Sequence, residues 1–143
     1  MIKQISNKKK LLTIIIDNKF KDEGIKFFTP DEFSQQLGYM SHPKGYIISP
    51  HVHNHIPREV QFTNEVLFIR SGKVRVDFYD DNQNYLQSSI LSQGDVILLA
   101  SGGHGFEILE PAEIIEVKQG PYIGDQDKTR FKSIDKSKIF LKD

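Results

Sequence analysis

The sequence predicts an all-β protein, built as a barrel or sandwich of short strands. From Gly45 onward, apolar and polar residues alternate with the two-residue period of a strand, and no long helical period reappears before the C-terminus. Glycines and short polar turns separate these runs. In the clearest run, after Gly72, the alternate positions Val74, Val76 and Phe78 predict a buried face. The predicted solvent face of that run consists of Lys73, Arg75, Asp77 and Tyr79.

The N-terminal part is expected to add a strand and a short helix. Leu11 to Ile16 is rich in β-branched residues and apolar on both faces, which predicts a strand covered on both sides. A second short strand is predicted from Ile25 to Phe28. Thr29 or Asp31 can cap a helix that ends near Gly38.

Further strands are predicted along the rest of the chain. The strand that opens at Glu65 is expected to end at the turn Ser71-Gly72. Beyond Gly120 the sequence becomes polar and predicts a surface loop, a short helix or an arm. The later strands are predicted at Tyr85 to Leu91, Asp95 to Ala100, Phe106 to Leu109 and Glu113 to Lys118.

Composition excludes several classes of function. Lysine plus arginine equal aspartate plus glutamate at 19 each, so no global charge attracts nucleic acid or an anionic membrane, and neither partner is expected. With no cysteine there is no disulfide, no cysteine metal site and no thiol nucleophile, which suits a cytoplasmic protein. The apolar run Leu11 to Ile16 is too short for a signal-peptide core or a membrane span. No glycine-rich phosphate loop precedes a helix.

Histidines and a glutamate suggest a metal site. In a strand, residues two apart point the same way, so His51 and His53 can bind one ion. Glu65 shares a strand face with Leu67 and Ile69, and an inward carboxylate requires a cation or a partner. The two imidazoles would meet that requirement through a shared ion.

An ion pair would satisfy the same carboxylate without a metal. In that interpretation Glu65 pairs with an arginine, and Arg58 and Arg70 are the candidates. In either interpretation His55 is expected to lie behind the metal ligands, without binding the ion itself, or in the surrounding loop.

The spacing of these residues resembles the first conserved motif of the cupins. That motif is a glycine, five residues, His-x-His, a spacer, a glutamate, six residues and a glycine. The corresponding residues here, in that order, are Gly45, His51, His53, Glu65 and Gly72. The spacer before Glu65 is longer than in the family. A second register, with His53, His55 and Glu59, has a short spacer but lacks the final glycine, and we prefer Glu65.

A second stretch resembles the second cupin motif. Gly94, the apolar run Val96 to Leu99, Gly102 and His104 follow its order, although Ala100 replaces its proline. The resemblance implies a small, single-domain bacterial cupin with a jelly-roll barrel, the double-stranded β-helix. In this interpretation the barrel core spans 45–120, with a strand-and-helix extension at 1–44 and a polar extension at 121–143.

The resemblance also implies a ligand set and a pocket. One divalent transition metal would be held by His51, His53, Glu65 and His104, and iron, manganese, nickel, cobalt and zinc all suit such donors. No catalytic residue and no organic cofactor site is assigned. The residues expected to contact a small-molecule ligand beside the metal are Tyr46, Ser49, Arg58, Phe106 and Tyr122.

Three functions remain open at this point. The first is a metal-binding cupin that binds a small polar metabolite, with or without turnover; the resemblance favours a carbohydrate-related one. The second is a non-catalytic binding or sensing module. The third is a metal-free isomerase or epimerase with a histidine as general base. A homodimer is also expected, with Leu11 to Ile16 paired or packed across its interface because an apolar edge strand requires a cover.

Overall fold

The structure is a computed structural model that describes residues 1–142, and these residues form an all-β protein without an α-helix. They divide into two compact units: residues 1–20 with the chain from Thr63 onward, here called the sheet unit, and residues 21–62, the loop unit. No helix of the described residues is long and apolar enough to cross a membrane. The strands are β1 (Ile2–Asn7), β2 (Lys10–Ile16), β3 (Gly24–Phe27), β4 (Gly38–Ser41), β5 (Glu65–Tyr79), β6 (Tyr85–Ser92), β7 (Val96–Leu99) and β8 (Gly103–Lys118), and the short 3-10 helices are η1 (Gly124–Asp127) and η2 (Lys136–Lys138).

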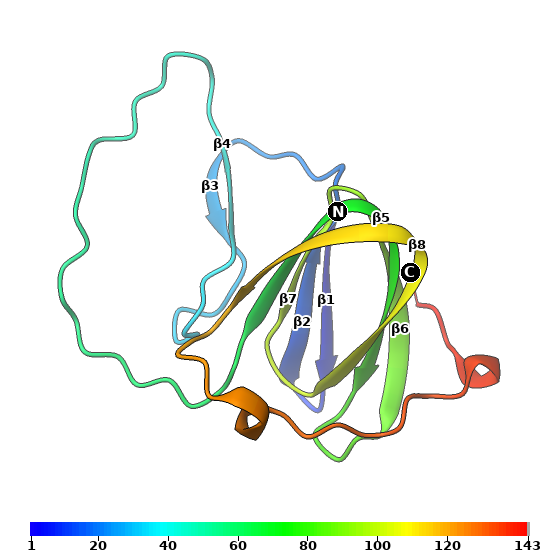
Figure 1. The fold of residues 1–143 in the computed structure, drawn as a ribbon. Helices are drawn as coiled ribbons and strands as arrows, with labels where there is room; N and C mark the ends of the chain where they lie inside the picture. The colour runs from blue at the N-terminus through cyan, green and yellow to red at the C-terminus, as the bar shows by residue number, and fades with distance from the viewer. Residues whose placement is uncertain (143) are drawn as a thin grey trace. The chain divides into compact units, whose positions relative to one another are not determined.

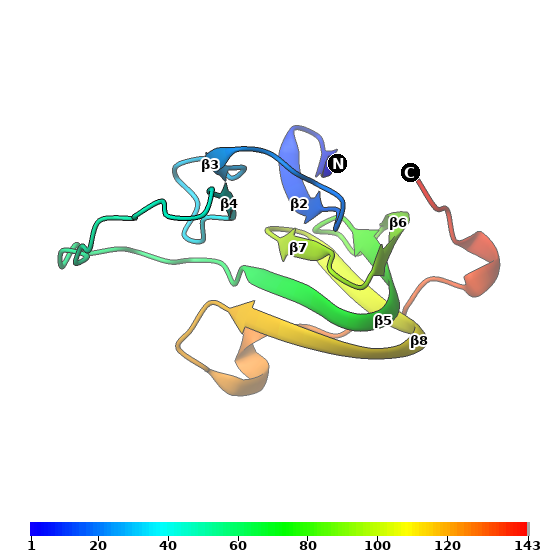
Figure 2. The ribbon, with the colours of Figure 1, turned by 90° about the horizontal axis from the view of Figure 1, so that it is seen from above.

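The sheet unit is one strongly curled antiparallel sheet with the strand order β1-β2-β7-β5-β6. The long strand β5 pairs with β7 through its first residues and with β6 through its last ones, while β8 pairs with its other edge. Figures 1 and 2 show β5 and β8 running side by side and bending together. This curvature allows the start of β5 and the start of β8 to lie near each other.

Gly72 is the point where β5 bends. The predicted turn at Ser71-Gly72 is wrong, because the chain continues through it as a single strand. The β5–β8 register shifts between Ile69 and Ser71, again between Ser71 and Lys73, and once more after Lys73. Gly72 has a φ of 81°, which glycine adopts at little cost, and such bulges increase the local bend and twist of a strand.

The core lies on one face of the curled sheet. Val74, Val76 and Phe78 are fully buried, so the predicted buried face of this run is confirmed. Asp77 and Tyr79 are buried as well, and for them the predicted solvent face is wrong. The C-terminal segment covers that face: the ring of Phe131 packs edge-on against Tyr79, whose hydroxyl accepts a hydrogen bond from the backbone N–H of Ile134.

The N-terminal strand is confirmed as β2 and is covered within the chain. It pairs with β1 on one edge and with β7 on the other, and its residues from Leu12 to Ile16 are buried. Leu11 to Ile16 therefore cannot serve as the predicted dimer interface, and that part of the expectation is wrong. The homodimer itself stays a prediction. Sequence reasoning did not predict β1, which joins β2 through a turn at Lys8 and Lys9 with positive φ.

The loop unit contains the hairpin β3–β4, and the predicted strand from Ile25 is present there, ending at Phe27. The predicted helix after Thr29 is wrong. Gln36 Nε2 donates to the carbonyls of Pro30 and Phe33, and the N–H of Leu37 donates to Thr29 Oγ1. Such side-chain hydrogen bonds satisfy the backbone in a turn and compete with helix formation.

Candidate functional site

Glu65 and His104 form the polar pair around which the candidate site is built. Glu65 Oε2 lies 3.0 Å from His104 Nε2, and 13% of the glutamate side chain and 30% of the imidazole are exposed. Glu65 shares the inward face of β5 with Leu67 and Ile69, both buried, as the alternation predicted. The sequence predicted that an inward carboxylate requires a cation or a partner, and His104 is the partner of Glu65. The proposed arginine partner is not seen: Arg70 lies near Glu113, with Nε 3.8 Å from Oε2.

The turn between β7 and β8 brings the two residues together. Leu99, the last residue of β7, is the register partner of Glu65, so the chain leaves β7 beside the start of β5. Asn64 Nδ2 donates to the carbonyl of Ala100 at 3.0 Å and holds the turn in place. Gly102 has a φ of 73°, and a Cβ there would lie 2.5 Å from the carbonyl oxygen of Tyr79. The close approach and the left-handed backbone explain the glycine before β8.

The electrostatics of the pair favour an ionised carboxylate. The pKa of Glu65 is lowered, first because His104 donates a hydrogen bond to it, while partial burial opposes the shift. The positive charges of His104, Lys128 and Lys118 lower it further. The site therefore presents a negative oxygen beside an accessible imidazole.

This pair should make stability depend on pH. A carboxyl with a lowered folded-state pKa stabilises the fold above its unfolded value of 4.5, and that contribution is lost as the pH falls through the folded-state pKa. In urea unfolding measured between pH 7 and pH 3, the wild type should lose more stability below pH 4.5 than Glu65→Gln does. Parallel pH profiles for the two proteins would contradict the ion pair.

Of the aromatic residues predicted to contact the ligand, Phe106 lies at this site and Tyr122 follows Lys118 in the sequence. The rings of His104 and Phe106 meet at 64° with centroids 5.5 Å apart, and the Phe106 ring is partly exposed. Lys118 Nζ lies 5.9 Å from the ring centroid of Tyr122. Lys118 is the register partner of Glu65, so Tyr122 lies near the end of β8 that pairs with the start of β5.

The other predicted site residues lie in the loop unit. His51 and His53 are close together, with ring centroids 5.3 Å apart, and both are exposed. Their segment has no strand pairing, so the predicted strand at this position is wrong. His51 Nδ1 lies 3.0 Å from the carbonyl oxygen of Ser49, and Tyr46 stacks on His42. The predicted contact Arg58 is exposed here.

Within the sheet unit Glu65 and His104 form a pair, and within the loop unit His51 and His53 form another. Among residues 1–142, no group of three or more histidine, aspartate or glutamate side chains is arranged to hold a metal ion. Glu59, the alternative ligand, is exposed and accepts a hydrogen bond from Gln61. The four-ligand metal centre therefore stays a prediction.

Sequence reasoning overlooked two lysines near Glu65. The sequence analysis places Lys118 only at the end of a predicted strand, and Lys128 within the polar segment beyond Gly120. The position of Lys118 near Glu65 follows from the pairing of β5 with β8, because directly opposed residues of an antiparallel pair lie on the same face. Lys128 follows η1, and its position could not be deduced from local pattern.

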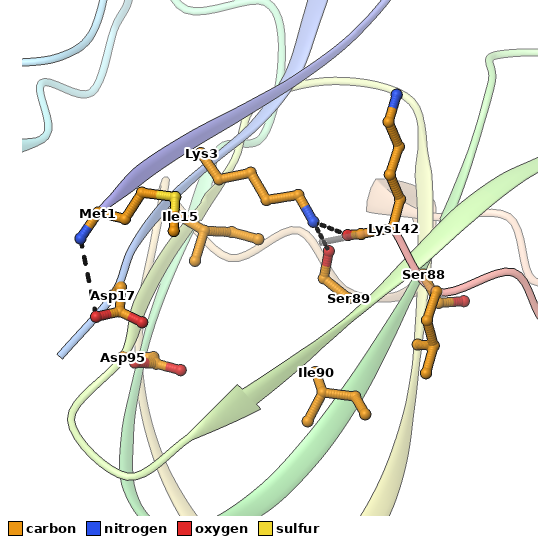
Figure 3. Close-up of a pocket in the computed structure, with 10 residues that line it drawn as sticks. Met1, Lys3, Ile15, Asp17, Ser88, Ser89, Ile90, Asp95 and Lys142 are labelled. Carbon is orange, nitrogen blue, oxygen red and sulfur yellow. Dashed lines mark hydrogen bonds and ion pairs between the residues drawn. The ribbon is translucent and has the colours of Figure 1, made fainter. Parts of the chain in front are cut away.

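A cavity of about 250 Å³ lies elsewhere in the sheet unit. Figure 3 shows it between β1, β2 and β6, where Lys3 Nζ donates to Ser89 Oγ at 3.0 Å and to the carbonyl of Lys142. These contacts join the first strand, β6 and the C-terminal residues. The cavity does not include Glu65 or His104.

No protein-family model matches this chain, and no curated protein and no solved structure matches it either. The fold and the pair define this chain as an all-β protein with a curled antiparallel sheet and a glutamate–histidine pair at the start of β5. The cupin assignment remains a prediction from motif order.

Proposed function

We propose that this protein binds a small polar molecule at the Glu65–His104 pair, and that the pair supplies two donors to a divalent transition metal. The observation that carries the proposal is the 3.0 Å contact between Glu65 Oε2 and His104 Nε2 on a mostly apolar inner face. A titratable group with a shifted pKa and a specific partner, here the Glu65 carboxyl beside His104, is typical of functional sites. The cupin-like order of the motifs supports the same position.

The chemistry of the donors suits a metal. A carboxylate oxygen and an imidazole nitrogen are donors that iron, manganese, nickel, cobalt and zinc accept. His51 and His53 remain the predicted additional ligands. A bound metal with open positions would polarise a carbonyl or hydroxyl oxygen of the ligand. Glu65 and His104 would bind and orient, and Phe106 would exclude water from one side.

The pair also supports a metal-independent function. When the imidazole is neutral and its Nε2–H donates to Glu65, the carboxylate orients the ring and Nδ1 is the nitrogen that can accept a proton. An oriented histidine can act as a general base in isomerisation or epimerisation of a sugar-like substrate. The third possibility, a binding or sensing module, uses the same contacts without turnover. The resemblance to cupins favours a carbohydrate-related ligand in all three cases.

The test compares Glu65→Gln and His104→Asn with the matched control Glu59→Gln. Metal content after reconstitution with each of the five metals is measured by elemental analysis, and ligand binding by calorimetry with a panel of sugars and small oxo-acids. Removing only the hydrogen-bond partner of a metal ligand lowers metal affinity roughly 10- to 100-fold. Both site variants remove a proposed ligand itself, so each should weaken metal and ligand binding by at least that factor. The control should behave as the wild type.

The outcomes separate the alternatives. Metal binding that survives Glu65→Gln but not Glu59→Gln would show that the other register is correct. Ligand binding and turnover without metal, both lost in His104→Asn, would favour the general-base function. Equal metal and ligand binding by all three variants and the wild type would overturn the proposal.

A further inference from the structure

The cavity between β1, β2 and β6 carries opposite charges at its two ends (Figure 3). At the basic end, Lys3 Nζ donates hydrogen bonds to Ser89 Oγ, at 3.0 Å, and to the carbonyl of Lys142. Figure 3 shows the side chain of Lys142 extending away from this end. At the acidic end, the carboxyl groups of Asp17 and Asp95 line the wall. The cavity therefore presents one ammonium group and two carboxylates at separate places.

An apolar side chain separates the two ends. Ile15 lies between them in Figure 3, and only 6% of it is exposed. Lys3 is the register partner of Ile15, and the pairing continues to Asp17, whose N–H donates to the carbonyl of Met1 at 3.0 Å. Because a strand rises about 3.3 Å per residue, Lys3 and Asp17 are attached about 7 Å apart along the strands. A molecule that contacts both groups needs an apolar middle of several methylene groups.

The acidic end already accepts an ammonium group. The amino nitrogen of Met1 lies 3.8 Å from Asp17 Oδ1, and both groups are substantially exposed, so this ion pair is weak and replaceable. The second carboxylate, Asp95, is fixed in position because its two oxygens accept the backbone N–H groups of Asn18 and Ser92, at 2.8 and 2.7 Å. Two carboxylates beside one weakly held ammonium leave this end suited to a cationic group.

We propose that this cavity binds a small zwitterion, an ω-amino acid whose carboxylate accepts a hydrogen bond from Lys3 and whose ammonium group takes the place of the Met1 amine at Asp17. Each end would then form a charge-assisted hydrogen bond, and the methylene chain would cover Ile15. The volume of about 250 Å³ is slightly below the roughly 300–1,000 Å³ of pockets for drug-sized ligands, so it suits a molecule of this size. The site does not include Glu65 or His104, so the inference does not depend on the function proposed above.

Calorimetry on the full chain with 6-aminohexanoate tests this inference, with hexanoate and hexylamine as probes that each lack one of the two charges. The zwitterion should bind at least about tenfold more tightly than either, because each analogue lacks one hydrogen bond to a charged group. Glycine has both charges but no chain between them, so it should bind more weakly than 6-aminohexanoate.

Two substitutions should divide the affinity by charge. Lys3→Gln should weaken 6-aminohexanoate about tenfold and leave hexylamine unchanged, whereas Asp17→Asn should weaken it equally and leave hexanoate unchanged. This crossed pattern cannot arise from a general loss of folding. Lys19→Gln and Asp81→Asn remove exposed charges of the sheet unit outside the cavity, and as controls they should change nothing.

The location of the bound probe gives a second measurement. In NMR spectra of the wild type, 6-aminohexanoate should shift the backbone amide signals of Lys3, Ser89 and Asp95. Shifts centred on Glu65 and His104 would overturn this inference and place the ligand at the other site. Equal affinity for 6-aminohexanoate, hexanoate and hexylamine, an equal effect of the control substitutions, or no binding of the zwitterion would each overturn it as well and leave the proposed function standing.

Discussion

Replacing Asp77 by alanine should lower the free energy of unfolding by about 3 kcal/mol, near the low end of the values for breaking a buried ion pair. Only 5% of the Asp77 side chain is exposed. Its carboxylate accepts hydrogen bonds from Arg75 Nε and Nη2, at 2.8 and 3.0 Å, and from Ser88 Oγ at 2.5 Å. The loss should not be larger, because Arg75 Nη1 keeps its ion pair with Glu107 at 2.6 Å.

Urea unfolding of Asp77→Ala beside Glu110→Ala measures this effect. Glu110 forms a 2.6 Å ion pair with Lys73, but both side chains are largely exposed, so its loss should cost less than about 1 kcal/mol. Each substitution removes the acidic partner of an ion pair, Asp77 in β5 or Glu110 in β8. The difference between the two losses of stability therefore measures the effect of burial on the ion pair. Losses of similar size would show that Asp77 is not held in the buried network described here.

Replacing Gly72 by alanine should destabilise the sheet unit by about 2–5 kcal/mol, or prevent folding. The backbone φ of 81° costs an L-residue about 1–2 kcal/mol. A Cβ at this position would lie 2.1 Å from the carbonyl oxygen of Pro111 and 2.7 Å from the Cα of Ala112, and overpacking of this kind typically costs another 1–3 kcal/mol. Both contacts are to backbone, which cannot move aside as a flexible side chain can.

Gly105→Ala is the matched control for this substitution. Gly105 lies in β8, has no positive φ, and a Cβ there would meet nothing closer than the Tyr79 ring at 4.0 Å. Its replacement should change stability by less than about 1 kcal/mol. If thermal and urea unfolding give the same stability for both variants, β5 does not bend at Gly72 in the manner described.

Local pattern was sufficient for most strands of the sheet unit. The β-branched run at Leu11 to Ile16 and the alternation at Val74 to Phe78 predicted strands and buried faces that the structure contains. The inward carboxylate at Glu65 was also predicted to require a partner, because burial of an unpaired charge is costly. These inferences depend only on the type of residue and on the two-residue period of a strand.

The errors come from contacts that are distant in sequence. Gly72 has the composition of a turn, but pairing with β8 converts it into a bulge within one strand. Asp77 has the pattern of a solvent-facing residue, but it is buried and bonded to Arg75 and Ser88. The helix after Thr29 failed for a local reason, since the Gln36 side chain bonds to the backbone of the turn.

The candidate site was predicted in part. Glu65 and His104 were both selected from the motifs, and the structure places them in contact. His51 and His53 lie together but in the loop unit, in a segment without strand pairing. Lys118 was overlooked because the register of β8 on β5 depends on the bulges near Gly72, which no local pattern reveals.

The central claim is that the Glu65–His104 pair is the binding centre, and a manganese(II) titration followed by NMR tests it most directly. Paramagnetic manganese broadens the signals of nuclei close to it, so the backbone amides of Glu65 and His104 and their neighbours should broaden at the lowest metal concentrations. The same amides should stay sharp in Glu65→Gln and His104→Asn at those concentrations, while Glu59→Gln should behave as the wild type. Broadening that centres on another part of the chain, or that is unchanged in both site variants, would contradict the account.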